Sequence, residues 1–208
     1  SFTTGDFISS HDEIFTNIDD IAPFSHTVTE LTLNGPVIPD FLTFFVSGRL
    51  DDEKGWLYGI RQHLPSDYAD VNPMNPNDIR LHQNGDSALV PMNPSREFSG
   101  TAKLTFSPFS TGKIRYDVLY SKSTWKSYNH SYKYNPDASY NNNEWGLLNS
   151  LEFRHALNSS TYYTVRGSMN LNDYKYYLYP LLDATGNPVD YSAGTDMNLA
   201  DYHADPRY

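Results

Sequence analysis

Apolar and polar residues alternate with a period of two in several separate segments of this chain, a pattern typical of β-strands with one apolar face. In residues 98–106 every even position holds an apolar residue or glycine, and every odd position holds Ser, Thr or Lys. The same alternation occurs in residues 29–33, 42–50, 114–121, 147–154 and 163–171, and less regularly in residues 2–9. The sequence therefore predicts an all-β fold with about seven antiparallel strands.

The connections between these strands alternate in length along the chain. Residues 10–25, 51–95 and 122–143 form long connections, as does the chain after about Tyr174, whereas residues 34–40, 107–112 and 158–160 form short ones. Successive antiparallel strands place every short connection at one end of the sheet and every long connection at the other. Outer-membrane β-barrels follow this plan, with tight periplasmic turns and long extracellular loops. A soluble β-sandwich also has alternating strands, but nothing in its architecture sorts connections by length.

The two tightest turns predict how the strands beside them pair. Pairing across these turns places Lys103 opposite Asp117 and Glu152 opposite Arg166. The same register places four apolar pairs on the other face: Phe106–Ile114, Leu104–Tyr116, Ala102–Val118 and Phe153–Val165. Opposite charges that face each other across two strands contribute roughly 0.2–1 kcal/mol per pair. A slip by one residue would turn every side chain to the wrong face, so these pairs help to specify the register.

Charge separates the two faces of the predicted sheet. In the four clearest strands one face carries no charged residue, and the other carries Lys103, Arg115, Asp117, Glu152, Arg154 and Arg166. An Arg or Lys on the lipid side of a barrel costs about 2–4 kcal/mol at the bilayer midplane. We therefore expect the uncharged face to contact lipid and the charged face to line the lumen of an up-and-down transmembrane β-barrel.

Seven strands are too few to close a barrel of this kind, because bacterial barrels use even numbers from about eight upward and plugged transporters have about 22. The alternation also stops before the loop-like residues 200–208. We therefore expect residues 1–208 to form roughly the first third of the wall of a larger barrel.

Composition and motifs exclude several classes of function. The chain has 15 Lys and Arg against 25 Asp and Glu, giving a formal charge of −10, so a basic stripe for nucleic acid is absent from the sequence. There is no Cys, no apolar run long enough for a spanning helix and no signal-peptide pattern at residues 1–5. Nucleotide-binding, hydrolase and zinc-protease motifs are also missing from the sequence, so we expect no enzyme activity and no cofactor.

Metal binding is weakly indicated. Asp19 and Asp20, and the run Asp51, Asp52 and Glu53, supply clustered oxygens of the kind that calcium prefers, but neither has the spacing of a known calcium loop. Solvated loop charge is the favoured interpretation, and His155 is interpreted as a surface residue rather than a ligand. No metal site is therefore assigned.

Four stretches of sequence resemble the start of the barrel in TonB-dependent receptors of Bacteroidetes-type bacteria, which carry an N-terminal carboxypeptidase-like regulatory domain. They are GDFISSHDEIFTNIDDIAPFSH, LNGPVIPDFLTFFVSGRLDDEKGWLYG, GDSALVPMNPSREFSGTAKLTFSP and YKYNPD. The resemblance implies a 22-stranded outer-membrane barrel with an internal plug, a nutrient bound at the extracellular loops, and import driven by the TonB–ExbB–ExbD complex. A surface lipoprotein partner is also compatible with it. The TonB box, plug, regulatory domain and closing strands of that family have no counterpart in these residues.

Aromatic residues in the long connections are the best candidates for ligand binding. We select Trp56, Tyr58, Tyr132, Tyr134 and Tyr140, whose rings could stack on a sugar or a peptide at the outer mouth of the barrel. For Tyr132, Tyr134 and Tyr140, an aromatic girdle at the membrane interface or simple loop packing is an equally good interpretation. The girdle or loop packing is the favoured interpretation for the residues that adjoin strands: Trp125, Tyr128, Tyr174, Tyr176, Tyr177 and Tyr179.

A second hypothesis remains open from the sequence alone. The high tyrosine content and low charge density also fit a soluble or surface-attached β-sandwich that binds carbohydrate. In a sandwich the ring-rich strand faces would be buried against a second sheet, whereas in a barrel they would be uncovered by protein. The nutrient itself is not indicated: an oligosaccharide, a peptide or another small molecule would suit the barrel hypothesis.

Overall fold

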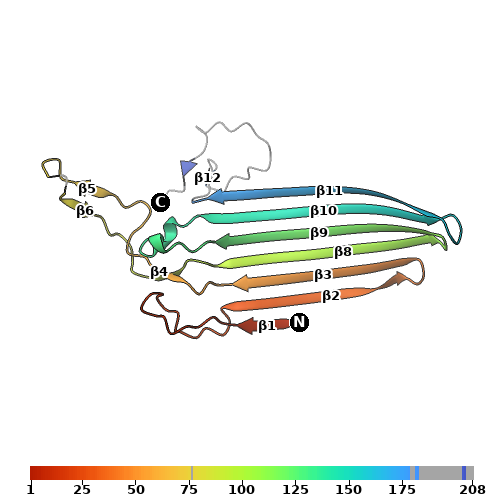
Figure 1. Cartoon of the computed structure of the whole chain (residues 1–208), viewed down its shortest axis with the longest axis horizontal. Helices are drawn as coiled ribbons and strands as arrows, with labels where there is room; N and C mark the ends of the chain where they lie inside the picture. The colour runs from red at the N-terminus through yellow and green to blue at the C-terminus, as the bar shows by residue number, and fades with distance from the viewer. Residues whose placement is uncertain (76, 179–180, 183–202, 205–208) are drawn as a thin grey trace.

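The computed structural model describes residues 1–75, 77–178, 181–182 and 203–204. Its main feature is one seven-stranded sheet in the order β1-β2-β3-β8-β9-β10-β11, with every neighbouring pair antiparallel (Figure 1). The bounds of these strands are β1 Phe2–Gly5, β2 His26–Ile38, β3 Leu42–Glu53, β8 Ser95–Phe109, β9 Gly112–Lys126, β10 Asn141–Ala156 and β11 Tyr162–Tyr177. The predicted all-β fold is confirmed, and the sheet is not closed into a barrel. No helix in the described part of the chain is long and apolar enough to cross a membrane.

Small elements occupy the long connections at the left of Figure 1, opposite the short turns. They are the strand pairs β4 Tyr58–Ile60 with β7 Leu89–Pro91 and β5 Ala69–Val71 with β6 Ile79–Leu81, and the 3-10 helices η1 His130–Tyr132 and η2 Pro136–Ala138. A further short pair, β12 Leu181–Leu182 with β13 His203–Ala204, follows the sheet in the chain. The end of the sheet with the short turns is the turn end, and the end with the long connections is the loop end.

The register is the one that the sequence predicts. Lys103 pairs with Asp117 across β8 and β9, and Glu152 pairs with Arg166 across β10 and β11. The four predicted apolar pairs, Phe106–Ile114, Leu104–Tyr116, Ala102–Val118 and Phe153–Val165, are also present. The alternation of side chains and the short turns therefore suffice to fix these two hairpins.

Several strands extend beyond the alternating segments, and the predicted connections are correspondingly too long. Residues 51–53, 122–126 and 141–143 were expected in connections but continue β3, β9 and β10, because the backbone ladder continues where the side chains no longer alternate. Likewise β11 continues past Tyr174 to Tyr177. Conversely, β1 ends at Gly5 rather than residue 9, since the Asp6 carboxylate accepts hydrogen bonds from the backbone N–H groups of Phe7 and Ala22.

The uncharged face of the sheet is not covered by other described elements. Val165 in β11 is 61% exposed and Leu31 in β2 is 64% exposed, and Leu104, Tyr116 and Leu151 between them are also exposed. Among the described residues the buried large apolar side chains are Ile18, Leu57, Met92 and Pro136, and all four belong to the long connections. The described chain is therefore a single sheet with a small packed cap at its loop end, and no second sheet lies against the apolar face in the described ranges.

Candidate functional site

A line of ion pairs crosses the charged face of the sheet from β8 to β11. Lys103 Nζ lies 3.8 Å from an oxygen of Asp117, and Arg115 Nε lies 3.0 Å from the other oxygen of that carboxylate. Arg115 Nη2 then lies 3.1 Å from Glu152 Oε2, and Arg166 Nη2 lies 2.9 Å from the same oxygen. The two predicted charge pairs are thus joined into one network of alternating charge by Arg115. Such a network fixes these side chains and gives this face a strongly polar character.

The long connections fold against each other at the loop end. Met92 is fully buried there, and a side chain at Gly59 would overlap both Met92 Sδ and the carbonyl oxygen of Lys133. The N–H of Ile60 donates to that same carbonyl at 2.7 Å. Only glycine allows this close approach, so Gly59 joins the β3–β8 connection to the β9–β10 connection.

Arg61 reinforces this junction through two carboxylates from different segments. Its Nε lies 2.6 Å from Asp137 Oδ2 in η2, and its Nη1 lies 3.0 Å from Asp86 Oδ2. The hydrogen bond to Asp137 is the largest cause that raises the pKa of Arg61, so this guanidinium stays charged. The pair with Asp137 joins the two long connections, and the pair with Asp86 holds two parts of the β3–β8 connection together.

The first long connection, residues 6–25, is attached to the same cap. Ser25 Oγ donates to Asp6 Oδ1 at 2.6 Å, and this bond is the largest cause that lowers the pKa of Asp6. The Phe7 ring lies 4.2 Å from the Trp56 ring, measured between centroids. Lys133 Nζ donates to the carbonyl of Ile14 at 3.1 Å. The cap therefore contains segments from three separate connections.

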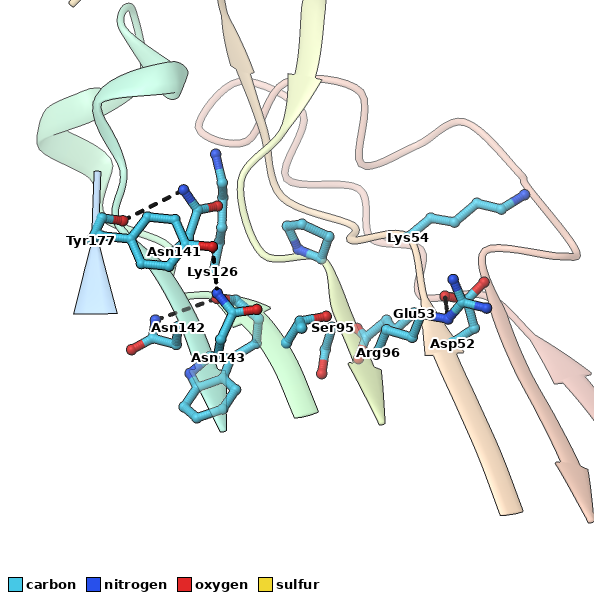
Figure 2. Close-up of a pocket in the computed structure, with 13 residues that line it drawn as sticks. Asp52, Glu53, Lys54, Ser95, Arg96, Lys126, Asn141, Asn142, Asn143 and Tyr177 are labelled. Atoms are coloured by element: carbon cyan, nitrogen blue, oxygen red, sulfur yellow. Dashed lines mark hydrogen bonds and ion pairs between the residues drawn. The ribbon is translucent and has the colours of Figure 1, made fainter. Parts of the chain in front are cut away.

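A pocket of about 290 Å³ opens where five strands meet this cap. Figure 2 shows its lining side chains at the ends of β3, β8, β9, β10 and β11. They include the carboxylates of Asp52 and Glu53, the cations of Lys54, Arg96 and Lys126, the amides of Asn141, Asn142 and Asn143, and the Trp125 ring. The pocket combines two aromatic residues, Trp125 and Tyr177, with many hydrogen-bonding groups and side chains of both charges, which suits a polar, hydroxyl-rich or amide-rich ligand.

The amides of the pocket are held in place before any ligand binds. Asn142, only 6% exposed, donates through Nδ2 to the Trp125 carbonyl at 3.3 Å and accepts from the Tyr174 hydroxyl at 2.6 Å. Asn143 Nδ2 donates to the Tyr177 hydroxyl at 2.9 Å, as a dashed line marks in Figure 2. Side chains ordered in advance lose less conformational entropy on binding, so this wall is preorganised.

The five predicted ligand residues do not line this pocket. Trp56 and Tyr58 lie instead beside Asp6 and Phe7, around a smaller cavity of about 40 Å³. Tyr132 is half-buried in η1, and Tyr134 and Tyr140 are exposed on the cap. Tyr140 stacks on Tyr176 of β11 with centroids 4.6 Å apart. All five residues lie at the loop end, but they do not form a single site. Their role in binding stays a prediction.

Sequence reasoning missed the amide wall and the position of Trp125. The signal was present as the run Asn141, Asn142 and Asn143, which was counted as part of a polar connection. Trp125, for which the sequence favours a membrane girdle or loop packing, lines the pocket and lies 6.2 Å from the Tyr174 ring; the girdle stays a prediction. Tyr179 lies outside the described residues.

The acidic runs considered for calcium make other contacts. Asp51 pairs with His26 at 2.8 Å and with Arg49 at 2.7 Å, and Asp52 lies 3.9 Å from Arg96. Asp19 and Asp20 are exposed in the first long connection. Within the described ranges no group of three His, Asp or Glu side chains is arranged to hold a metal ion. His155 packs in edge contacts with the rings of Phe109 and Tyr163.

Comparison of the chain with known proteins finds no matching family model, no matching curated protein and no matching solved structure. The resemblance to TonB-dependent receptors therefore stays a prediction, carried by the quoted stretches of sequence.

Proposed function

We propose that this chain forms part of the wall of a bacterial outer-membrane β-barrel, a receptor of the TonB-dependent type that binds a nutrient at its loop end and imports it. The observation that carries the proposal is the contrast between the two faces of one sheet. One face is apolar and uncovered along the middle of its strands, and the other holds a continuous network of ion pairs.

Hydrocarbon is the natural environment for the uncovered face. Large apolar patches rarely face water in soluble proteins, and here they extend from Leu31 in β2 to Val165 in β11. Turning the sheet over would place Lys103, Arg115 and Arg166 against lipid, at about 2–4 kcal/mol for each near the midplane. The charged face therefore belongs toward a wet or plugged interior.

The edges of the sheet support a larger assembly of strands. Among the described residues β1 and β11 each pair on one side only. A lipid-exposed sheet edge would leave backbone N–H and C=O groups without partners, each at several kcal/mol, so spanning sheets close into barrels. Further strands beyond these two edges would complete the wall. Their number, the internal plug and the TonB–ExbB–ExbD complex as energy source follow from the resemblance.

The cap and the pocket provide the binding part of the proposal. In an outer-membrane barrel the long connections face the outside and the short turns face the periplasm. The pocket beside Trp125 and Asn142 would then lie at the outer mouth, where a nutrient arrives. Its ring and preordered amides suit an oligosaccharide or a peptide.

A β-sandwich that binds carbohydrate would need a second sheet against the apolar face. The described part of the chain contains none, and no observation here favours the sandwich over the barrel.

Spin labels in β11 test the placement of the two faces. The chain has no Cys, so single Cys substitutions add a unique site to it. In full-length protein within native outer membranes, labels at Val165 and Met169 should be accessible to oxygen, and labels at Ser168 and Asn170 to a water-soluble nickel chelate. Immobile labels at Val165 and Met169 that neither reagent reaches would indicate burial against protein and overturn the proposal.

Transport is tested in the bacterium itself. Deleting the gene should abolish growth on one or a few nutrients at limiting concentration, and deleting the tonB function should have the same effect. A gene deletion that leaves uptake of every tested nutrient unchanged, or uptake that continues without TonB, would contradict the receptor assignment.

A further inference from the structure

The apolar face contains a groove of about 310 Å³ between β2 and β9. Its floor is formed by Gly48 and Gly100, which pair directly across β3 and β8, and the row continues to Leu31 on one side and Tyr120 on the other. The next row, Leu33, Val46, Ala102 and Val118, extends the groove toward the turn end. The two glycines thus leave the centre of this row without side chains between Leu31 and Tyr120.

The groove ends toward the loop end of the sheet at Phe98. The Phe98 ring lies over Gly100, where an added Cβ would meet it at 3.5 Å, and is 6.1 Å from the Tyr120 ring. In contrast, a Cβ added at Gly48 would meet nothing within 4 Å. The groove is therefore a depression with an aromatic rim at one end, and its floor has open space above Gly48.

Two cations lie just beyond this rim, on the same face of the sheet. Lys122 pairs with Phe98 across β8 and β9, and Arg96 is two residues from Phe98 along β8. Both side chains are exposed; Arg96, which also lines the 290 Å³ pocket at the loop end, is 3.9 Å from Asp52, and Lys122 forms no ion pair within the described ranges. The chain as a whole carries a charge of −10, so an exposed cation pair beside an apolar groove is a local exception.

From this arrangement we infer that the groove binds an anionic lipid, with an acyl chain above Gly48, beside the Phe98 ring that covers Gly100, and its phosphate between Arg96 and Lys122. A phosphorylated lipid matches both halves of the site, because the surface of the groove is almost entirely apolar and the rim offers positive charge. The inference rests on the proposed function, since it needs the apolar face to lie in the membrane. It adds to that function a specific lipid on the outside of the barrel wall.

Native mass spectrometry of the full-length protein, purified in mild detergent, provides the test. The probes are dilauroyl phosphatidic acid and dilauroyl phosphatidylcholine, which share acyl chains and differ in net charge. We expect about tenfold stronger retention of phosphatidic acid, since each cation near the lipid surface favours it. The double variant R96Q/K122Q should remove this preference, and G48L should reduce retention of phosphatidic acid by filling the groove.

Matched controls use the same chemistry away from the groove. Lys113 is an exposed cation at the turn end, and Gly167 in β11 has nothing within 4 Å of an added Cβ, so K113Q and G167L should retain phosphatidic acid as the native protein does. Equal retention of both lipids in every variant would overturn the lipid site while leaving the barrel proposal in place. Dimers that G48L dissociates would show a second protein copy in the groove instead and would also overturn it. Absence of the native protein from the outer membrane would remove the proposed function and this site together.

Discussion

The wall of the sheet and the cap at its loop end are held together in different ways. In the wall each strand pairs with its neighbour in the chain through long regular ladders, and the ion pairs from Lys103 to Arg166 follow from that register. In the cap, single contacts join segments far apart in sequence, such as Arg61 with Asp137 and Lys133 with Ile14. The loss of one contact in the wall therefore leaves many parallel contacts in place. The loss of one contact in the cap can release a whole connection.

The largest effect should come from emptying the small core of the cap. Met92→Ala should destabilise the cap by about 2–5 kcal/mol, because Met92 is fully buried and its removal leaves a cavity. Met169→Ala in the wall truncates the same residue type at a position that is 54% exposed, so its effect on protein stability in lipid should be small. Hydrogen exchange of the full-length protein in lipid vesicles measures both, peptide by peptide. Equal local destabilisation by the two variants would show that the wall and the cap depend on buried side chains to the same extent.

A somewhat smaller effect is expected from crowding the junction of the long connections. Gly59→Ala should destabilise the cap by about 1–3 kcal/mol, since the added methyl group meets the Lys133 carbonyl and Met92. Gly167→Ala is the matched control in the wall, where the added methyl group meets nothing within 4 Å. Protease sensitivity of residues 54–94 should rise in the first variant and stay unchanged in the second. A G59A cap as resistant as the native one would show that the connections are not joined at this glycine.

The ion-pair network of the wall should contribute less for each pair. Glu152 contacts both Arg115 and Arg166, so Glu152→Gln should lower the free energy of unfolding in lipid vesicles by about 1–2 kcal/mol. A double-mutant cycle with R166Q should give a coupling energy of about 0.5–1 kcal/mol, measured by urea titration. Zero coupling would mean that the charged face is fixed by the backbone ladder alone.

The sequence predicts the wall far better than the cap. The reason is that the contacts of the hairpins join residues close together in the chain, whereas those of the cap join residues far apart in the chain. The register of Lys103 with Asp117 depends on a turn only a few residues long, and a slip by one residue reverses both faces. The pocket needs Asn142 beside Trp125 and Tyr174, from three different strands, below a cap whose connections meet through Gly59. No periodic pattern encodes such contacts, so aromatic residues were selected by type, and the run of Asn residues that forms the wall of the pocket was overlooked.

The smallest effect concerns pH and the first long connection. Hydrogen bonds, chiefly from the Ser25 hydroxyl, lower the pKa of Asp6 below its ordinary value of 3.8. A lowered pKa favours the folded connection above the ordinary value, and this contribution is lost as the pH falls from about 4 through the lowered pKa. A spin label at Ser10→Cys should therefore become more mobile below about pH 4.

The wall again supplies the control for this prediction. A label at Ser110→Cys, in the turn between β8 and β9, has no such carboxylate nearby in the chain and should keep its mobility over the same pH range. Asp6→Asn should leave the Ser10 label mobile at every pH, because the amide lacks the charge that the Ser25 hydroxyl and the two N–H groups stabilise. If both labels loosened together, the acid would be acting on the sheet, and residues 6–25 would be tied to the wall rather than to the cap. Loosening of the Ser10 label alone would place the weakest attachment of the molecule at Asp6, where the chain leaves the ladder of β1 for the loop end.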